Sequence, residues 1–549
     1  MASSFHVEHF GCRAARADGE AVGDRLRASG HCVRQPHEAD VVIVNTCSVT
    51  AEADRSARAF IRRAHRLNPA AKIVVTGCYA QRAPDELARM EGVAAVIGNS
   101  HKGLAPEIIA GLLIRPSKSD PGFPSIPQKT RNGRGTESAG VQAGAVAGDA
   151  PAEAGETLIQ IQAATKPERA ASEQLAAPQV LVWADDRFAH SFLEEAQLTP
   201  GAQTRPNLKI QEGCGNRCTF CVIPFTRGPS KSLAQAAVLR QVEGFVAAGG
   251  KELVVSGINL GRWGRDFRRG EPAASLSHPF PQKDTEMDGE PSFVDEVAER
   301  LQRPMLAGLV RQIFSQTALP RLRLSSIEPM DWDAELIGLM AEFGGARLAR
   351  HAHLPLQSGS DAVLRRMHRR YRPWHYVDKV QALVQAGGAE LTLGADVLVG
   401  FPGETDAEFE ETMALVRALP FGYLHLFPFS ARPGTPGWAM HSERPVPAQV
   451  VEERMKALRA LALEKSKAHR RRFVGREVEA ITLHTAAETS ARGRTTALTE
   501  NFLPVEIERR LAANLLVRVR VSGVNPDGTL EAAPAATASS QYAATAMSV

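Results

Sequence analysis

Three cysteines stand close together as C-x3-C-x2-C in the segment GCGNRCTFC, at Cys214, Cys218 and Cys221. Thiolates at this spacing on one loop can hold three irons of a cubane cluster, and the fourth iron can then bind a small molecule. The alternative is a zinc site, but zinc sites prefer four ligands in paired C-x2-C spacing, and no second pair lies nearby. The pattern therefore favours an iron–sulfur cluster with one open iron.

Three further cysteines each follow a predicted strand near the amino terminus, at Cys12 in FGC, Cys47 in NTC and Cys78 in TGC. The carboxyl ends of parallel strands share one edge of a sheet, so these thiols can converge and hold a second cluster. Three buried core cysteines are the alternative, because cysteine packs well in cores. For the seventh cysteine, Cys32 in HCVR, core packing is the preferred interpretation.

The elements around the amino-terminal cysteines predict a small α/β domain. VVIVNTC (41–47) and KIVVTGC (72–78) are compact β-branched runs that suit buried parallel strands. Between them, residues 51–69 have helical spacing, with one apolar side made of Ala57, Phe60, Ile61 and Ala64. Strand, helix and strand with short connections imply a parallel sheet.

From residue 207 to about 440, β-like runs alternate with amphipathic helices. The strand candidates are KELVVSG, RLRLSSIE, RHAHLPL, ELTLGADVLVG and GYLHLFPF. This repetition predicts a full or partial parallel barrel with its active site at the carboxyl ends of the strands. A long helix over 450–473 follows, and the short runs EVEAITLH and LLVRVRVSGV indicate a small all-β module.

These patterns divide the 549 residues into five parts. The predicted boundaries are 1–114 for the first domain, 115–204 for a linker, 205–442 for the barrel, 443–532 for the connecting helix and all-β module, and 533–549 for a disordered tail. The linker and an insert at about 266–291 within the barrel are irregular in composition, and the linker segment 117–157 is rich in Pro, Gly, Ser and Ala.

Composition is that of an ordinary soluble protein, with 44% hydrophobic and 23% charged residues and a net charge of +4. A nucleic-acid partner must therefore be met by local basic patches. No apolar run approaches the roughly 18 residues that span a membrane, and the amino terminus lacks a signal-peptide segment. A cytoplasmic, membrane-free protein is expected, with a monomer as the default, and its seven cysteines are interpreted first as thiols or metal ligands.

The segment GCGNRCTFC at the head of a β/α repeat, with Phe220 before the last cysteine, resembles the radical S-adenosylmethionine superfamily. The resemblance implies that the open iron binds the amino and carboxylate groups of S-adenosyl-L-methionine. It also implies reductive cleavage of the sulfonium to a 5′-deoxyadenosyl radical, with the three cysteines as catalytic cluster ligands. A low-potential electron donor such as flavodoxin or ferredoxin is then required.

FGC, VVIVNTCSVTAEADRSAR and KIVVTGCYAQ, placed ahead of that segment, are similar to the methylthiotransferases of this superfamily. The resemblance covers about residues 5–104, 205–265, 321–440 and 470–525. It implies a second, auxiliary 4Fe-4S cluster on Cys12, Cys47 and Cys78, a partial barrel for the central domain, and a carboxyl-terminal β-barrel of the TRAM type that grips RNA. One departure is Ala15, where the family usually carries Asn, and it puts in doubt any hydrogen bond from that Asn to the auxiliary site.

Several segments look like the branch that acts on N6-threonylcarbamoyladenosine in transfer RNA, among them LRLSSIEP, HLPLQSGSDAVLRRMHRRY, DVLVGFPGET and FPFSARPGTP. The implied reaction adds a methylthio group to carbon 2 of this nucleoside at position 37, beside the anticodon. The isopentenyladenosine branch and the branch that modifies ribosomal protein S12 are the alternatives within the family. An iron–sulfur protein that binds RNA or transfers electrons without catalysis is the alternative from another class.

Residues at the carboxyl ends of the barrel strands are expected to bind S-adenosylmethionine, on the pattern of the family. An ordinary turn or a helix cap is the alternative at each position, and Ser358, Gly359, Ser360, Gly403 and Glu404 are open to the same two interpretations. The expected contacts are Ser256, Gly257, Asn259, Ser326, Glu328, Gln357 and Gly400.

RNA contact is expected at a basic cluster at the end of the long helix and at one aromatic residue. The alternatives are a solvated helix end for the cations and burial for the ring. The aromatic residue is Phe502, and it follows Thr499, Glu500 and Asn501 in a signature similar to the family's. In the functional interpretation, the cations bind phosphates and the Phe502 ring stacks on a base. The expected contacts are Lys467, Arg470, Arg471, Arg472 and Phe502, with Lys465 in the same cluster.

Overall fold

The amino-terminal domain is built on a parallel sheet with helices on both faces, as its β-branched runs predict. The computed structural model describes residues 3–113, 180–186, 188, 193, 198, 204–267 and 305–535. The sheet order is β2-β1-β3-β4-β5-β6, and every pairing is parallel. Its strands are β1 (Ser4–His9), β2 (Cys32–Val33), β3 (Val41–Thr46), β4 (Lys72–Gly77), β5 (Val93–Gly98) and β6 (Leu181–Trp183).

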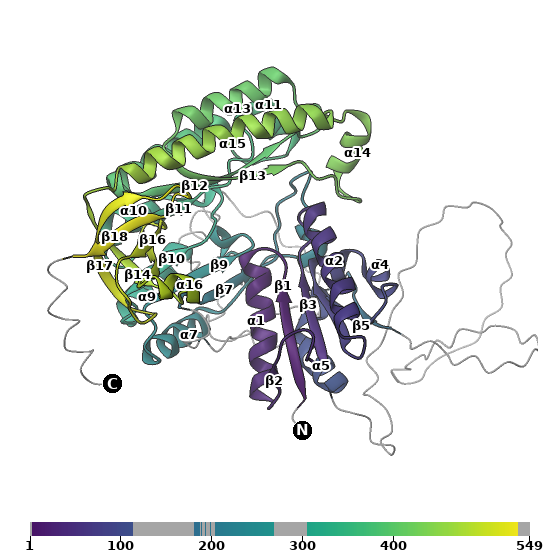
Figure 1. The fold of residues 1–549 in the computed structure, drawn as a ribbon. Coiled ribbons are helices and arrows are strands. Elements are labelled where there is room, and N and C mark those ends of the chain that lie inside the picture. Colours follow the sequence, from purple (N-terminus) through teal and green to yellow (C-terminus); the bar gives the residue numbers. More distant parts are fainter. Residues whose placement is uncertain are drawn as a thin grey trace, which may run out of the picture.

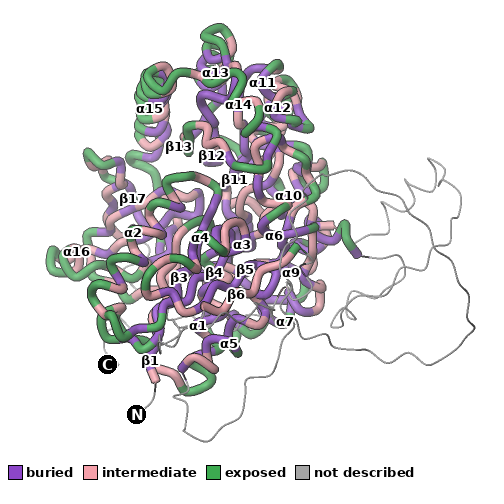
Figure 2. Tube along the Cα trace, turned by 90° about the vertical axis from the view of Figure 1, so that its right-hand side faces the viewer, coloured by how far each residue is buried: buried purple, intermediate pink, exposed green. Residues whose placement is uncertain are grey.

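The helix predicted between the two central strands is α2 (Ala51–Leu67), and Thr50 caps it by accepting a hydrogen bond from the Ala53 amide over 3.2 Å. Ala57, Ile61 and Ala64 are buried on one face, as the spacing predicts. The other helices of this domain are α1 (Arg13–Ala28), α3 (Cys78–Arg82), α4 (Pro84–Ala88), η1 (Asn99–Leu104) and α5 (Ala105–Leu113). The buried strands of this sheet form the centre of the domain in Figure 2.

Two predictions about this domain need correction. Leu181–Trp183 falls inside the predicted linker, yet it forms β6 at the edge of the sheet, beside β5. Cys32 is half-buried on the two-residue edge strand β2, so it is not a core residue, and it pairs with Ser4 at the end of β1 opposite to Cys12. The rest of the predicted linker, apart from a few residues near 180–204, lies outside the described residues, as do 268–304 and 536–549.

The central domain is a partial barrel of parallel strands. One sheet has the order β10-β9-β7-β8 and the other β11-β12-β13. Backbone hydrogen bonds between Leu322 and the segment 347–349 join the two sheets through β10 and β11. The strands are β7 (Asn207–Glu212), β8 (Lys231–Ser232), β9 (Glu252–Gly257), β10 (Arg321–Leu324), β11 (His351–His353), β12 (Thr392–Val399) and β13 (Phe421–Pro428). Among the described strands of this domain, β8 is the one that runs antiparallel, at the edge beside β7.

Helices cover the outer side of this curved sheet, and their buried Leu, Val and Phe side chains form its main core with the outward-facing strand residues. The helices that supply this core are α7 (Gln235–Ala247), α9 (Leu306–Gln316), α10 (Ala334–Phe343), α11 (Asp361–Arg366), α12 (Pro373–Gly387) and α13 (Asp406–Ala418). Shorter helices lie in the connecting segments: α6 (Ile223–Arg227), η2 (Leu260–Arg262), η3 (Pro329–Asp331), η4 (Gly388–Glu390) and α14 (Pro436–Glu443). None of the helices in the described ranges is long and apolar enough to cross a membrane.

The long helix α15 (Ala448–Arg471) lies along β13 and leads into the carboxyl-terminal module, drawn in yellow in Figure 1. That module is a closed five-stranded barrel with the order β14-β15-β16-β18-β17. Its elements are β14 (Glu477–Thr482), α16 (Ala487–Ala491), β15 (Thr495–Thr499), β16 (Pro504–Ile507), β17 (Leu516–Val524) and β18 (Leu530–Pro534). The three predicted architectures are therefore confirmed, and β18 extends two residues into the predicted tail.

Candidate active site

Cys214, Cys218 and Cys221 lie on the loop that leaves the carboxyl end of β7 and enters α6. Hydrogen-bond donors point at two of their sulfurs. The Asn216 amide and Asn259 Nδ2 lie 3.4 and 3.6 Å from Cys214 Sγ, and Arg369 Nη1 lies 3.3 Å from Cys218 Sγ. Donors aimed at sulfur favour thiolate, which is the form that binds iron.

Burial, helped by the nearby Cys218 and Cys214, raises the pKa of the Cys221 thiol to about 12. Three thiolates this close therefore need a positive partner, and iron supplies that charge. The loop is fixed to the barrel by the Thr219 amide, which donates to the Met367 carbonyl over 3.2 Å, and by the Gly437 amide, which donates to the Thr219 carbonyl over 2.7 Å. The donor set and its support fit a cluster held by three cysteines.

The residues expected to bind S-adenosylmethionine follow four neighbouring barrel strands at the same edge as this loop. Ser256 and Gly257 end β9, Ser326 and Glu328 follow β10, Gln357 follows β11, and Gly400 follows β12. Asn259 reaches Cys214, as described above, and Glu328 pairs with Arg369. The Oγ of Ser256 and the Oδ1 of Asn259 are buried and have no hydrogen-bond partner among the residues that the structure describes. Unpaired buried polar atoms beside the cluster loop fit a polar ligand such as the cofactor's amino acid group.

Two of these positions have backbone conformations that explain their residue types. Gly400 has a φ of +79°, and its amide donates to Glu404 over 2.8 Å, so Glu404 closes the turn after β12. Gln357 also has a positive φ, 63°, which is uncommon for a residue other than glycine. Ser358 bonds with Thr412 Oγ1 at 3.1 Å, so its hydroxyl packs the turn onto α13. Ser358 and Glu404 therefore have structural roles in the turns after β11 and β12, which was the alternative to cofactor binding.

The amino-terminal cysteines converge at the carboxyl edge of three adjacent strands. Cys12 follows β1, Cys47 follows β3 and Cys78 follows β4, and these strands are neighbours in the sheet. A Cβ atom on Gly11 would lie 3.0 Å from Cys47 Sγ, so only glycine lets the Cys12 loop approach Cys47 this closely. Burial, together with the neighbouring Cys78 and Cys12, raises the pKa of Cys47 to about 12.

Donors also surround the sulfurs of this triad. The Val49 amide lies 3.5 Å from Cys47 Sγ, and Cys78 Sγ accepts from Asn99 Nδ2 at 3.4 Å and from Arg227 Nε at 3.2 Å. Asn99 also donates to the Thr226 carbonyl over 2.8 Å. Thr226 and Arg227 are the last residues of α6, the helix that follows Cys221. The hydrogen bonds of Asn99 and Arg227 therefore join the segments that carry the two triads.

Arg227 belongs to a buried charge network between the amino-terminal domain and the barrel. Its Nη1 lies 3.0 Å from Asp18 on α1 and 2.6 Å from Glu212 on β7, and Lys102 and Lys209 pair with both carboxylates. Burial raises the pKa of the Glu212 carboxyl, but Arg227, Lys102 and Lys209 outweigh it and hold this pKa well below its usual value. Three cations against two carboxylates leave one net positive charge beside Cys78, which suits an anionic thiolate site.

Sequence reasoning missed Arg227 and Arg369, because each bonds to a cysteine about 150 positions away in the chain. It also missed Asn99, which lies 21 positions after Cys78, at the end of the next strand. It also missed His353, Asp396 and His425, which lie together on β11, β12 and β13. The available signal for the second group was the polar residues inside otherwise apolar strand runs. Ala15 is buried, and its backbone carbonyl accepts a hydrogen bond from Asn45 Nδ2.

The expected RNA contacts separate into two groups. Lys467, Arg471 and Arg472 are exposed at the end of α15, and Arg470 is half-buried. Phe502 instead packs on the central barrel. Its ring centroid lies 4.4 Å from that of His351 and 5.6 Å from that of Tyr423, and the Arg323 guanidinium lies 5.3 Å above it. The structure therefore shows a half-buried Phe502 ring that packs on the central barrel, which is nearer to the structural alternative than to a free stacking surface.

Two family descriptions match this chain. "Uncharacterized protein family UPF0004" matches residues 4–98, and "Radical SAM superfamily" matches residues 208–416. These ranges contain the first and the second cysteine triad, respectively.

Curated relatives match along most of the chain. "Threonylcarbamoyladenosine tRNA methylthiotransferase MtaB" of Bacillus subtilis is 30% identical over 503 residues, which are 91% of this chain and 89% of the relative. The protein of the same name from Treponema pallidum is 30% identical, with 94% of this chain and 98% of the relative covered. "tRNA-2-methylthio-N(6)-dimethylallyladenosine synthase" of Cereibacter sphaeroides is 29% identical, with 96% and 97% covered.

Proposed function

Because the chain belongs to the radical S-adenosylmethionine methylthiotransferases, as 30% identity over 89% of a curated relative shows, we propose that it methylthiolates carbon 2 of N6-threonylcarbamoyladenosine at position 37 of transfer RNA. The observation that carries this proposal is the pair of cysteine triads, each at the carboxyl edge of a parallel sheet and joined through Asn99 and Arg227. A tRNA substrate places the reaction in the cytoplasm.

The triad of Cys214, Cys218 and Cys221 would hold the 4Fe-4S cluster that this superfamily uses. When bound, cluster and S-adenosylmethionine together supply a 5′-deoxyadenosyl radical. The chain's own residues enclose this site and donate hydrogen bonds to the sulfurs of Cys214 and Cys218. Among the residues that the structure describes, Ser256 Oγ and Asn259 Oδ1 have no hydrogen-bond partner and would be available to the cofactor. A low-potential electron donor, flavodoxin or ferredoxin in kind, is part of this proposal.

The triad of Cys12, Cys47 and Cys78 would hold a second 4Fe-4S cluster, the auxiliary one. Its support is the convergence of three strand ends, the three donors that lie within 3.5 Å of the sulfurs of Cys47 and Cys78, and the net positive charge of the network around Arg227. When bound, this cluster supplies the site for the sulfur that is transferred. The link through Arg227 and Asn99 keeps the two cluster sites in a fixed relation.

Exposed cations on and beside the carboxyl-terminal barrel would bind the RNA backbone. Lys467, Arg471 and Arg472 at the end of α15 are followed by Arg476 and by Arg518 on β17, all exposed. Phosphate neutralisation by such side chains gives affinity that falls with salt concentration. The contact of Phe502 with the central barrel fixes this basic surface relative to the active site.

The test is an anaerobic assay of reconstituted protein with S-adenosylmethionine, dithionite and an anticodon stem-loop RNA, followed by nucleoside mass spectrometry. We expect a methylthio product from RNA that carries threonylcarbamoyladenosine and none from RNA that carries isopentenyladenosine. The reverse result would assign the isopentenyl substrate, which corresponds to the dimethylallyladenosine in the name of the Cereibacter relative. Cleavage of S-adenosylmethionine with no product from either RNA would leave the radical chemistry and overturn both tRNA substrates.

A further inference from the structure

Three polar side chains, His353, Asp396 and His425, lie together on neighbouring strands of the central barrel, where barrels are usually filled with aliphatic side chains. On β12, Leu393, Ala395, Val397 and Val399 belong to the hydrophobic core under the helices. Because side chains alternate along a strand, Asp396 lies on the opposite, inner face. Its register partner on β13 is His425, and His353 on β11 lies beside it.

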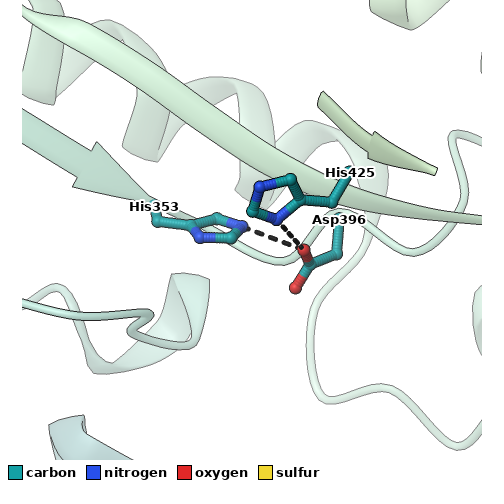
Figure 3. A group of neighbouring side chains, drawn as sticks. All are labelled: His353, Asp396 and His425. Carbon is teal, nitrogen blue, oxygen red and sulfur yellow. Dashed lines mark hydrogen bonds and ion pairs between the residues drawn. The ribbon is translucent and has the colours of Figure 1, made fainter. Parts of the chain in front are cut away.

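His353, Asp396 and His425 form a group held by one carboxylate oxygen. Asp396 Oδ1 lies 3.1 Å from His353 Nε2 and 3.2 Å from His425 Nδ1, as Figure 3 shows. Burial raises the pKa of Asp396, but the hydrogen bonds from His353 and His425 outweigh it and hold this pKa well below its usual value. Asp396 is therefore an ionised acceptor at neutral pH, and because both histidine nitrogens meet Oδ1, its Oδ2 receives no hydrogen bond from these two rings.

The group is open to a ligand on one side and joined to the cofactor site on the other. The His425 side chain is 51% exposed and that of Asp396 is 22% exposed, although both stand on inner strand positions. His353 is buried, and its Nδ1 lies 3.1 Å from the hydroxyl of Ser326, one of the residues expected at the S-adenosylmethionine site. A molecule that enters beside His425 would thus meet Asp396 within a short distance of that cofactor.

We propose that His353, Asp396 and His425 bind the polar N6 substituent of the target adenosine and so select threonylcarbamoyladenosine over isopentenyladenosine. This inference rests on the proposed function. Asp396 Oδ2 can accept a hydrogen bond from an N–H of the carbamoyl group. The Nδ1 of the half-exposed His425 faces Asp396, so its Nε2 can bond to the threonyl hydroxyl or carboxylate.

The physical basis of the selection is the cost of unpaired polar groups. An isopentenyl group offers no hydrogen bonds, so it would displace water from Asp396 and His425 without replacing the lost contacts. A site built to hydrogen-bond its substrate rejects an analogue that lacks those groups more strongly than an apolar pocket rejects an added one. His353 acts as a positioning residue, because both of its ring nitrogens face other residues of the chain.

The test measures how three anticodon stem-loop RNAs bind to the reconstituted full-length protein. They carry threonylcarbamoyladenosine, isopentenyladenosine or plain adenosine at position 37. We expect the wild type to bind the threonylcarbamoyl RNA at least about tenfold more tightly than the adenosine RNA, the factor for one net hydrogen bond. His425→Phe should reduce this ratio to about one, and His425→Gln should restore part of it. His37→Phe, the same change at an exposed site, should keep the wild-type ratio.

An unchanged ratio in His425→Phe, with the iron content and 5′-deoxyadenosine formation of the wild type, would overturn the inference while the proposed function stands. A wild type that methylthiolates only the isopentenyl RNA would overturn the proposed function itself. A further metal ion, present in wild type beyond the cluster iron and lost in both His425→Phe and His353→Ala, would make this group a metal site and would also overturn the inference.

Discussion

Arg227 donates a hydrogen bond from Nε to the sulfur of Cys78 over 3.2 Å, although 149 positions separate the two residues in the chain. Arg227 ends the helix that follows the Cys214–Cys221 loop, and Cys78 belongs to the other triad. The same guanidinium binds Asp18 and Glu212, so its position is fixed from several sides. The two triads therefore belong to one connected interior, and their relative placement does not depend on a flexible hinge.

Replacing Arg227 is expected to change the auxiliary cluster selectively. The positive charge of Arg227 and its hydrogen bond to Cys78 both stabilise the reduced, more negative cluster. Arg227→Gln removes both. The midpoint potential of this cluster should fall by roughly 60 mV or more, the one-electron equivalent of a tenfold change. The measurement is a redox titration followed by electron paramagnetic resonance. Arg369→Gln is the matched control, because Arg369 donates to Cys218, and it should shift the other cluster instead. An auxiliary potential that stays the same at full iron content contradicts this role of Arg227.

Iron content distinguishes two clusters from one. The reconstituted wild type should contain about eight irons, and Cys47→Ala and Cys214→Ala should each retain about four, because each variant loses one ligand of one three-cysteine set. Iron and sulfide analysis with Mössbauer spectroscopy measures this. Cys32→Ala is the control, because Cys32 lies on the edge strand β2, and it should retain all the iron. If Cys47→Ala keeps the full iron count, the amino-terminal cysteines are ordinary buried residues.

Glu252 should make stability depend on acid pH. Burial raises the pKa of this carboxyl, but Arg323, Arg205 and Arg321 outweigh it and bring the pKa from 4.5 to about 2. Because this pKa is lower in the folded than in the unfolded protein, the ionised carboxylate stabilises the fold fully at pH values above 4.5. This stabilisation is lost as the pH falls from 4.5 toward 2. Glu252→Gln should therefore cost about 3 kcal/mol at neutral pH. Thermal unfolding from pH 7.5 to pH 3 should show the difference in midpoint between the two proteins narrowing below pH 4.5. A difference that is constant over this range would contradict the assignment.

Phe502→Ala should lower stability more than RNA affinity. The ring packs between His351, Tyr423 and Arg323, at the contact between the carboxyl-terminal module and the central barrel. Removing a half-buried ring of this kind should cost about 2 kcal/mol. Thermal unfolding and RNA binding at several salt concentrations measure the two effects. In contrast, Arg471→Ala with Arg472→Ala should weaken binding and reduce its salt dependence. If Phe502→Ala strongly weakens RNA binding without changing stability, Phe502 contacts RNA directly and its structural role is contradicted.

Sequence reasoning could place residues whose position follows from local pattern. Cys12, Cys47 and Cys78 each follow a β-branched run, and the rule that parallel strands end at one edge was enough to bring them together. It could not place Arg227 against Cys78 or Phe502 against His351, because these contacts depend on how separate domains dock. Leu181–Trp183 was also missed, since three residues beside a low-complexity segment have no periodicity, and only pairing with β5 makes them a strand.

The most direct test of the central claim is the nucleoside product formed by the reconstituted protein from stem-loop RNA bearing threonylcarbamoyladenosine, with S-adenosylmethionine and reductant. The account predicts a mass increase of one methylthio group on that nucleoside, together with 5′-deoxyadenosine, and loss of both in Cys214→Ala. In Cys47→Ala, 5′-deoxyadenosine should still form while the methylthio product disappears, because only the triad of Cys214, Cys218 and Cys221 binds the cofactor that is cleaved. Full iron occupancy of both triads with no methylthiolated nucleoside would contradict the account.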